Sequence, residues 1–377
     1  MTVQISKENE NLMKVIFTTY RGKNHPYMDL LTEALADKGV QVKFTYPGYW
    51  TLLRAVKEHG LPDVFHLQWQ HPLFLASRLD KMIILTVLFF LQFLLLRLLG
   101  VRFVWTVHEL LHFGTNRPGW EMAASRLLAR LVEQLIVHCD TAVSIVADEL
   151  KIKPTRISVV AQGHYADYYP PAPNQLEARS QLALPSDDIV ILFFGHIRPY
   201  KGVDKLMDTF IQTEMENARL IVLGKPHGAT PELAPQLAEI AASDSRILTR
   251  FEYVPDDELA VYLGACDLVA LPYTDSLTSA AALLAGSYGR PILAPKLGCM
   301  GEFPPDAAIL YDPLATDGLQ KAMNEAITAP LADMGEASKQ YSLQFPWSLV
   351  ATKTKDVYIS VLKKDHSPQR QTSEALR

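Results

Sequence analysis

The fold of this chain is decided by the stretch Ile189-Val-Ile-Leu-Phe-Phe-Gly-His-Ile-Arg-Pro-Tyr-Lys-Gly202. Its six leading apolar residues, closed by Gly195, are typical of a buried parallel strand. A basic loop follows, and apolar residues then recur at helical spacing, at Val203, Leu206, Met207 and Phe210. A strand, a basic loop and a helix N-terminus in succession favour phosphate binding, because main-chain N–H groups and the helix dipole attract anions. Spacing alone leaves a second interpretation open, in which Arg198 and Lys201 are ordinary solvated loop charges.

Length and composition indicate two globular domains. The chain has 377 residues, of which 49% are hydrophobic and 20% charged, and a chain of this size divides into domains of about 180 residues. The net charge of −5 argues against general nucleic-acid binding. The three cysteines lie far apart without a Cys-x-x-Cys pair, and residues 1–11 lack the apolar core of a signal peptide. We therefore expect a cytoplasmic protein without a zinc site.

Strand and helix patterns alternate along both halves. Residues 14–19 and 40–46 read as strands around a helix at 27–38, which is a βαβ opening and implies a parallel sheet. Further on, we expect a helix over 121–138 and a short strand over 141–144. The second half alternates in the same way, so each half is expected to form a doubly wound sheet with its ligands at the carboxyl ends of the strands.

A titratable pair ends one strand of the first half. The segment Val101-Arg-Phe-Val-Trp-Thr-Val-His-Glu109 is apolar until His108 and Glu109. Parallel sheets place their chemistry at this end of a strand, so His108 is the best single candidate for a site residue in this half. His66 and Trp69 end an earlier strand and could contact a sugar, but core packing is the favoured interpretation for both.

The most hydrophobic segment spans residues 82–99. It is interrupted only by Thr86, Gln92 and Arg97, and Lys81 and Arg102 flank it. An apolar run of this length with basic flanks is typical of a helix at an anionic membrane surface, whereas a spanning helix needs about 20 apolar residues. We favour peripheral contact with a membrane over spanning. Burial between layers of the protein stays open as the alternative.

The basic loop also resembles a known motif. Gly-His-Ile-Arg-Pro-Tyr-Lys-Gly is similar to the donor-diphosphate loop of GT-B glycosyltransferases, in particular those of family 4. Lys201 and Gly202 match the family pattern. The family's usual arginine is His196 here, so Arg198 is expected to supply the second positive charge.

Three more patches carry the resemblance and imply roles for their residues. Trp-Thr-Val-His is similar to the acceptor-domain strand whose histidine faces the donor sugar, which implies a catalytic role for His108. The first loop of the family approaches the donor phosphates through a glycine, here Gly22. Thr278 and Ser279 are expected at a helix N-terminus, where they would bind phosphate, with an ordinary helix cap as the alternative.

One departure concerns the acidic residues of the donor site. Retaining members of family 4 usually carry two glutamates eight positions apart, and the matching positions here are Ser276 and Leu284. Neither residue is acidic. Asp275 or Glu302 would therefore have to contact the donor sugar and the ribose.

The resemblance implies an α/β fold of the GT-B type, with two Rossmann-like, doubly wound parallel-sheet domains facing across a cleft. Residues 1–180 would form the acceptor-binding domain and residues 181–340 the donor-binding domain. A helix at 341–362 would cross back to the first domain, and 363–377 would be a disordered tail.

The implied activity is transfer of a sugar from a UDP- or GDP-sugar to a hydroxyl of a glycan or lipid-linked acceptor, in polysaccharide biosynthesis. Retention of configuration is the family expectation. The basic loop and helix N-termini would stabilise the departing diphosphate, so no metal or cofactor is expected. The enzyme would lie in the cytoplasm, peripheral on the inner face of the membrane. A nucleotide-sugar epimerase of the same fold and a non-catalytic partner protein remain as alternatives.

Overall fold

The computed structural model describes residues 12–18, 26–213, 216–228 and 230–363. The chain divides into two compact units. The first unit contains the chain up to Ala161 and the segment from Trp347 onward, and the second contains Gln162–Pro346. Residues 162–180 thus belong to the second unit, although the sequence pattern placed them in the first domain. The expected disordered tail lies outside the described residues, apart from Lys363.

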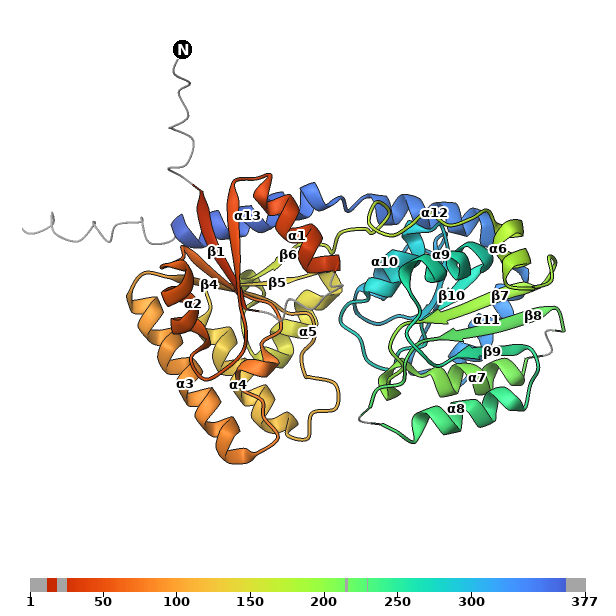
Figure 1. Ribbon diagram of the computed structural model, residues 1–377, viewed down its shortest axis with the longest axis horizontal. Coiled ribbons are helices and arrows are strands. Elements are labelled where there is room, and N and C mark those ends of the chain that lie inside the picture. The colour runs from red at the N-terminus through yellow and green to blue at the C-terminus, as the bar shows by residue number, and fades with distance from the viewer. Residues whose placement is uncertain (1–11, 19–25, 214–215, 229, 364–377) are drawn as a thin grey trace, which may run out of the picture. The chain divides into compact units, whose positions relative to one another are not determined.

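The first unit is built on a six-stranded parallel sheet (Figure 1). The strand order is β2 (Val40–Thr45), β1 (Met13–Thr18), β3 (Val64–Leu67), β4 (Arg102–Thr106), β5 (Gln134–Val137) and β6 (Ile157–Val159). The helices are α1 (Pro26–Ala36), α2 (Thr51–His59), α3 (Leu79–Leu98), α4 (Pro118–Leu131), α5 (Asp140–Leu150) and α13 (Trp347–Lys363), with short 3-10 turns at His71–Leu73 and Pro154–Arg156. All residues of β3 and β5 are buried, as expected for central strands covered on both faces.

Two assignments from the sequence are wrong. The helix expected over 121–138 ends at Leu131, and its last part is strand β5. The strand expected over 141–144 is the first part of helix α5. Strand β5 has one polar and three apolar residues and pairs with β4 and β6. A run this short has no periodicity that separates a strand from a helix.

The C-terminal helix α13 packs into the core of the first unit. Its residues Val350, Ala351, Val357, Tyr358 and Val361 are buried in one cluster with α1 and the central strands. The hydroxyl of Tyr358 lies 2.6 Å from Nδ1 of His66 on β3. His66 is buried and its Nε2 lies 2.7 Å from the hydroxyl of Thr106, so His66 is a core residue, as the sequence favoured.

The second unit contains another six-stranded parallel sheet. Its order is β12 (Ala308–Tyr311), β11 (Ile292–Pro295), β10 (Leu268–Ala270), β7 (Ile189–Phe194), β8 (Ala218–Leu223) and β9 (Ile247–Arg250). Its helices are α6 (Gln175–Gln181), α7 (Val203–Ile211), α8 (Leu233–Ala242), α9 (Asp256–Ala265), α10 (Ala280–Ser287), α11 (Gly318–Thr328) and α12 (Leu331–Leu343), and 3-10 turns lie at Pro199–Lys201 and Gly298–Glu302. The two doubly wound parallel sheets expected from the sequence are confirmed.

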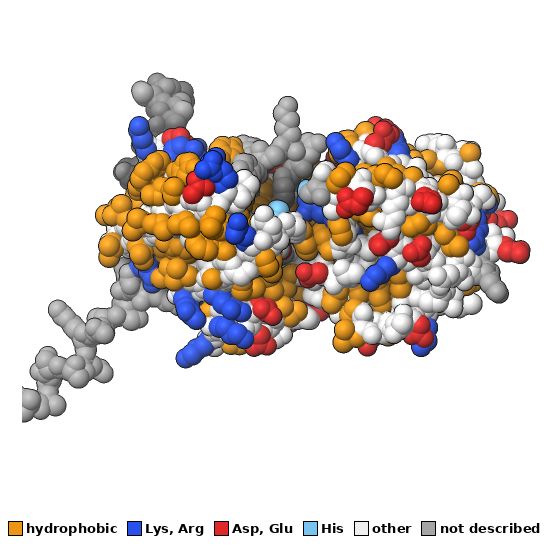
Figure 2. All heavy atoms as spheres, turned by 90° about the horizontal axis from the view of Figure 1, so that it is seen from below, with side chains coloured by type: hydrophobic (Ala, Val, Ile, Leu, Met, Phe, Trp, Pro, Cys, Tyr) orange, Lys and Arg blue, Asp and Glu red, His pale blue; other side chains and the backbone are white. Residues whose placement is uncertain are grey.

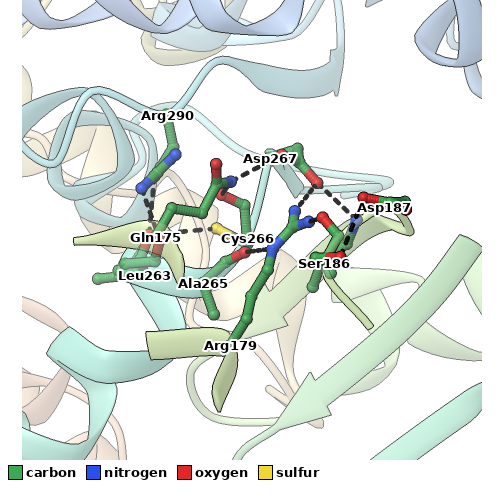
Figure 3. Close-up of polar contacts among 11 residues, drawn as sticks. Gln175, Arg179, Ser186, Asp187, Leu263, Ala265, Cys266, Asp267 and Arg290 are labelled. Atoms are coloured by element: carbon green, nitrogen blue, oxygen red, sulfur yellow. Dashed lines mark hydrogen bonds and ion pairs between the residues drawn. The ribbon is translucent and has the colours of Figure 1, made fainter. Parts of the chain in front are cut away.

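A partly buried ion pair ties helix α6 to the amino end of the second sheet (Figure 3). A guanidinium nitrogen of Arg179 lies 2.6 Å from a carboxylate oxygen of Asp267, directly before β10. The same carboxylate accepts the main-chain N–H of Val190 in β7 at 2.7 Å, and Gln175 donates to its other oxygen at 2.8 Å. This network explains why residues before β7 pack with the second unit. It also holds β7 and β10 side by side at the end opposite to their loops.

Strands β7 and β10 are neighbours, although they are far apart in sequence. From β7 the chain continues to β8 and β9 on one side, and β10 to β12 fill the other side. The carboxyl ends of β7 and β10 therefore form a topological switch point, the position at which open α/β sheets bind ligands. In the first unit the same reversal falls between β1 and β3.

Candidate functional site

The basic loop after β7 is held against the loop after β10. Gly202 has a φ of +61°, and a Cβ at this position would lie 2.3 Å from the carbonyl oxygen of Pro272. Only glycine permits this approach without a shift of the backbone. The main-chain N–H of Thr274 donates to the carbonyl of Tyr200 at 2.7 Å and joins the two loops. The residues on both loops are thereby brought to one edge of the sheet.

Lys201 is a partly buried cation at this edge. Its Nζ lies 5.2 Å from the ring centroid of Tyr273 and 5.9 Å from that of Phe193. Among the described residues, no carboxylate lies within 4.0 Å of this nitrogen. Burial lowers the pKa of Lys201, and the nearby charge of Arg198 acts in the same direction. A cation that is desolvated without a carboxylate partner favours an anionic ligand.

The other basic residues of the loop add to the positive potential. Arg198 is partly buried, directly before the 3-10 turn that carries Lys201. Partial burial, and then the charges of Lys201 and Arg198, lower the pKa of His196. His196 is therefore neutral near pH 7, and the two fixed charges of the loop are those of Arg198 and Lys201.

Thr278 and Ser279 lie at the N-terminus of α10, as the sequence predicted. The Ser279 hydroxyl oxygen accepts the N–H of Ala282 at 3.3 Å, so Ser279 is the N-cap of this helix. The Thr278 hydroxyl donates to the side-chain oxygen of Gln162 at 3.2 Å. Both hydroxyls already have partners within the protein, so an anion at this helix end would be met chiefly by main-chain N–H groups and the dipole.

The acidic candidates of the second unit lie on adjoining segments. Asp275 is exposed on the loop after β10, and Glu302 ends the 3-10 turn after β11. Gly298 brings the two segments together, since a Cβ there would lie 2.4 Å from the carbonyl of Leu277. Leu284 is buried inside α10, so its position offers apolar packing where the family has a glutamate.

His108 is the central residue of a polar row in the first unit. Strands β3, β4 and β5 are neighbours, and Gln68, His108 and His138 follow their carboxyl ends. His108 Nε2 lies 2.9 Å from Gln68 Oε1, and His108 Nδ1 lies 3.2 Å from His138 Nε2. His138 is buried, and its Nδ1 lies 2.8 Å from the carbonyl oxygen of Val160. Burial lowers the pKa of His138 to about 4.

Aromatic side chains fix the plane of the His108 ring. Trp69 stacks on the imidazole, with centroids 4.4 Å apart and planes 10° apart. Tyr27 meets it edge to face at 5.1 Å and in turn contacts Trp347 of α13 at 5.5 Å. The stack holds the plane of the imidazole, and the contacts of its two nitrogens with Gln68 and His138 fix their directions within that plane.

A second cluster, which the sequence analysis did not identify, lies beside this row. His71 is buried between Glu109 and Glu121, with Nε2 3.0 Å from Glu109 and Nδ1 2.5 Å from Glu121. Burial opposes the charge on His71, but the carboxylates of Glu109 and then Glu121 outweigh burial and raise the pKa of His71. Burial likewise opposes ionisation of Glu121, and the bonds from His71 and the His112 N–H outweigh it and lower the pKa of Glu121.

This cluster holds the carboxylate of Glu109, the residue that follows His108 in the chain. Glu121 is fully buried, whereas Glu109 is partly exposed at the end of β4. The imidazolium of His71 thus orients the accessible carboxylate of Glu109. The sequence contained one signal for it, the His108-Glu109 pair, but the partners lie 38 and 12 residues away from Glu109 in the chain.

The structure brings six of the predicted site residues to the carboxyl edge of the second sheet, and these are Arg198, Lys201, Asp275, Thr278, Ser279 and Glu302. His108 lies at the corresponding edge of the first sheet. Gly22 falls outside the described residues. Within the described part of the chain, no group of three or more His, Cys, Asp or Glu side chains is arranged to hold a metal ion.

Comparison with known proteins matches both units. Residues 26–166 match the model described as Glycosyltransferase Family 4, and residues 188–329 match the model described as Glycosyl transferases group 1. A GDP-mannose:glycolipid 4-beta-D-mannosyltransferase of Xanthomonas campestris pv. campestris is 29% identical over 93% of each chain. Part of the chain also matches a D-inositol 3-phosphate glycosyltransferase of Gordonia bronchialis, at 26% identity over 62% of this chain and 53% of the relative.

Solved structures have the same fold at low identity. Sucrose-phosphate synthase from Thermosynechococcus elongatus superposes with a TM-score of 0.74 at 15% identity, covering 93% of this chain and 99% of its own. Anabaena HepE in complex with UDP and glucose superposes with a TM-score of 0.70 at 16% identity, covering 92% and 100%.

Proposed function

This chain belongs to the GT-B glycosyltransferases of family 4, and we propose that it transfers a sugar from a nucleotide diphosphate sugar to a hydroxyl of a lipid-linked glycan in polysaccharide biosynthesis. The observation that carries the donor assignment is Lys201, a desolvated cation without a carboxylate neighbour among the described residues, at the switch point of the second sheet. The glycolipid acceptor named for the Xanthomonas relative supports the acceptor class.

In the proposed reaction the bond between the anomeric carbon and the phosphate oxygen breaks, and the nucleotide diphosphate leaves with added negative charge. Lys201 and Arg198 would stabilise that charge, together with the N-terminal dipoles of α7 and α10. Because these groups of the protein can stabilise the negative charge of the leaving diphosphate, we propose a transfer that needs neither a metal ion nor a cofactor.

His108 would act at the anomeric centre or on the acceptor. With retention, which the family resemblance implies, His108 positions the donor sugar. With inversion, its imidazole takes the proton of the acceptor hydroxyl as the new bond to the anomeric carbon forms. Proton NMR of the product made from a donor of known anomeric configuration distinguishes the two outcomes.

Calorimetric titration with UDP and with GDP, followed by turnover of the matching sugar nucleotides, tests the proposal. We expect micromolar binding of one nucleotide, weakened at least tenfold by Lys201→Ala. Lys205→Ala is the matched control, because Lys205 is exposed on α7 four residues further along. Equal affinity of the wild type and Lys201→Ala would remove Lys201 from the donor site. If neither UDP nor GDP binds, the proposed function is overturned.

A further inference from the structure

From Ile83 to Leu98, every exposed residue of α3 is aliphatic. Exposed residues follow one another at spacings of three or four along the helix, at Ile83, Ile84, Val87, Leu91, Leu94, Leu95 and Leu98. We call these seven residues the apolar face. Leu91 is 59% and Leu98 85% exposed. A surface helix of a globular domain normally presents polar side chains outward, so this face requires an apolar environment.

The inward side of α3 is anchored in the first unit. Gln92 is buried, accepts the N–H of Leu53 at 3.2 Å and donates to the carbonyl of Tyr49 at 2.8 Å. The indole N–H of Trp120 donates to the hydroxyl of Thr86 at 3.2 Å. Met82, Phe89, Phe90, Phe93 and Leu96 complete the buried side.

These contacts decide between spanning and lying on a membrane. By length and composition alone, α3 could cross a bilayer, and it is the one such helix among the described residues. If α3 spanned a bilayer, Gln92 and Thr86 would lose their hydrogen bonds, and α3 would no longer pack against α2 and α4. Contact through the apolar face alone keeps every one of these hydrogen bonds.

Two exposed aromatic residues lie at the start of α2, the helix that packs on α3. Trp50 is 57% exposed and begins α2, and its neighbour Tyr49 is exposed and is linked to α3 through Gln92. Trp and Tyr rings are enriched at the headgroup level of bilayers, where an apolar body and a polar tip are both solvated well.

The charge around the helix is positive, although the chain as a whole carries −5. Residues 78–102 contain four basic side chains and a single acidic one, Asp80. Arg78 is paired with Asp80, and Arg97 is paired with Glu133 at 3.3 Å. On α4, which is joined to α3 through Trp120, Arg130 is exposed and Arg126 is partly exposed. Figure 2 shows a broad hydrophobic area on this unit with Lys and Arg side chains along its border. This combination matches the headgroups of anionic lipids.

We propose that the apolar face of α3 docks into the interface of an anionic lipid bilayer, with the helix axis in the membrane plane and Trp50 at headgroup level. The seven aliphatic side chains enter the acyl boundary, and the flanking cations meet the phosphates. The proposal concerns the surface alone and holds for whatever acceptor the enzyme uses.

Flotation of the purified full chain with vesicles tests the proposal. We expect co-flotation with phosphatidylglycerol/phosphatidylcholine vesicles, and little with phosphatidylcholine alone. The variant Val87→Glu/Leu91→Glu/Leu98→Glu should lower the floated fraction at least tenfold. The matched control Leu176→Glu/Leu314→Glu/Ile327→Glu changes three exposed aliphatic residues of the second unit, of which Leu314 is 91% exposed, and should float like the wild type.

Further measurements separate docking from its rivals. Thermal melting and nucleotide binding of both triple variants should equal those of the wild type, which shows that the folds and the donor site are intact. Alkaline carbonate should release the bound wild type, and resistance to release would mean spanning and overturn the proposal. Absence of flotation would also overturn it. A dimer by light scattering that the α3 variant abolishes would then assign the face to a second copy of the chain.

Discussion

His138 Nε2 lies 3.2 Å from His108 Nδ1, and His138 Nδ1 lies 2.8 Å from the carbonyl oxygen of Val160. Burial lowers the pKa of His138 to about 4, so His138 is neutral at pH 7. A carbonyl oxygen only accepts, and His138 must therefore carry its proton on Nδ1 and accept the Nδ1–H of His108 on Nε2. Nε2 of His108 faces the amide oxygen of Gln68 at 2.9 Å, which also only accepts, so Nε2–H donates to it and is the proton of His108 that can be exchanged with a substrate.

Replacement of His138 by Phe removes the acceptor that sets the tautomer of His108 and retains an aromatic ring. We expect kcat to fall with little change in donor KM, by up to the roughly 10²–10⁴-fold that proton transfer by one positioned group contributes. The acidic limb of the pH–kcat profile should also move. His59→Phe, at the surface of the first unit, is the control. An unchanged profile and kcat would mean that His138 is only a packing residue.

Lys201 predicts a pH dependence of nucleotide affinity. A lysine binds a phosphate only while protonated, and burial followed by the charge of Arg198 lowers the pKa of Lys201. Affinity for the preferred nucleotide should therefore decline at a pH below the 10.5 of an ordinary lysine. Lys201→Arg should abolish that decline, since arginine stays charged. Calorimetry from pH 7 to 10 measures both, and a flat wild-type profile would contradict the prediction.

The buried cluster of His71 and Glu121 predicts a window of stability. The raised pKa of His71 contributes stability that is complete below the unfolded value of 6.5 and is lost as the pH rises through the folded pKa. The lowered pKa of Glu121 contributes stability above its unfolded value of 4.5, which is lost as the pH falls through the folded pKa. The contribution of the pair is thus greatest between pH 4.5 and 6.5.

Glu121→Gln should lower the free energy of unfolding by about 3 kcal/mol in that window, because it leaves His71 with one carboxylate partner. The loss should shrink above the raised pKa of His71. Glu149→Gln, on the surface of α5, should change stability little. Urea titrations at pH 5.5 and pH 9 give the comparison, and an equal loss at both would mean that His71 is not protonated in the native state.

Gly202→Ala should destabilise the second unit and weaken nucleotide binding together. A Cβ would lie 2.3 Å from the carbonyl oxygen of Pro272 at a φ of +61°, and strain plus overpacking cost about 3 kcal/mol. Gly119→Ala is the control, because its Cβ would meet nothing within 4 Å near the start of α4. Thermal melts and nucleotide titration measure the two effects, and a stable variant with full affinity would contradict the role assigned to Gly202.

Tyr358→Phe removes the hydroxyl that pairs with His66 between α13 and β3. Both groups are buried, so an unsatisfied imidazole nitrogen should cost about 1–3 kcal/mol. The exposed Tyr253→Phe should cost nothing measurable. Denaturant unfolding of the two variants makes the comparison, and equal stability would mean that water replaces the lost hydroxyl.

Local sequence patterns predicted most of the helices and strands, and many of the candidate site residues at the carboxyl edge of the second sheet. The apolar run Ile189–Phe194, closed by Gly195, is strand β7, and Lys201, Thr278 and Ser279 lie at loop and helix-end positions as expected. These features depend on a few consecutive residues, so they can be read from a sequence. Strand β5 was missed because its four residues, three of them apolar, are too few to show a periodicity and its burial comes from neighbouring strands.

Contacts between distant residues decided the rest. The partners of His108 lie 40 and 30 residues away in the chain, and His71, the partner of Glu109, lies 38 residues away. They meet only because strands β3, β4 and β5 are neighbours in the sheet. The apolar segment at 82–99 could have been buried, and only its packing against Leu53 and Trp120 revealed which side stays exposed. Most helices and strands of this chain, apart from β5 and the start of α5, could be predicted from short runs of consecutive residues. Tertiary structure alone decided their partners, because hydrogen bonds and burial depend on distance in space.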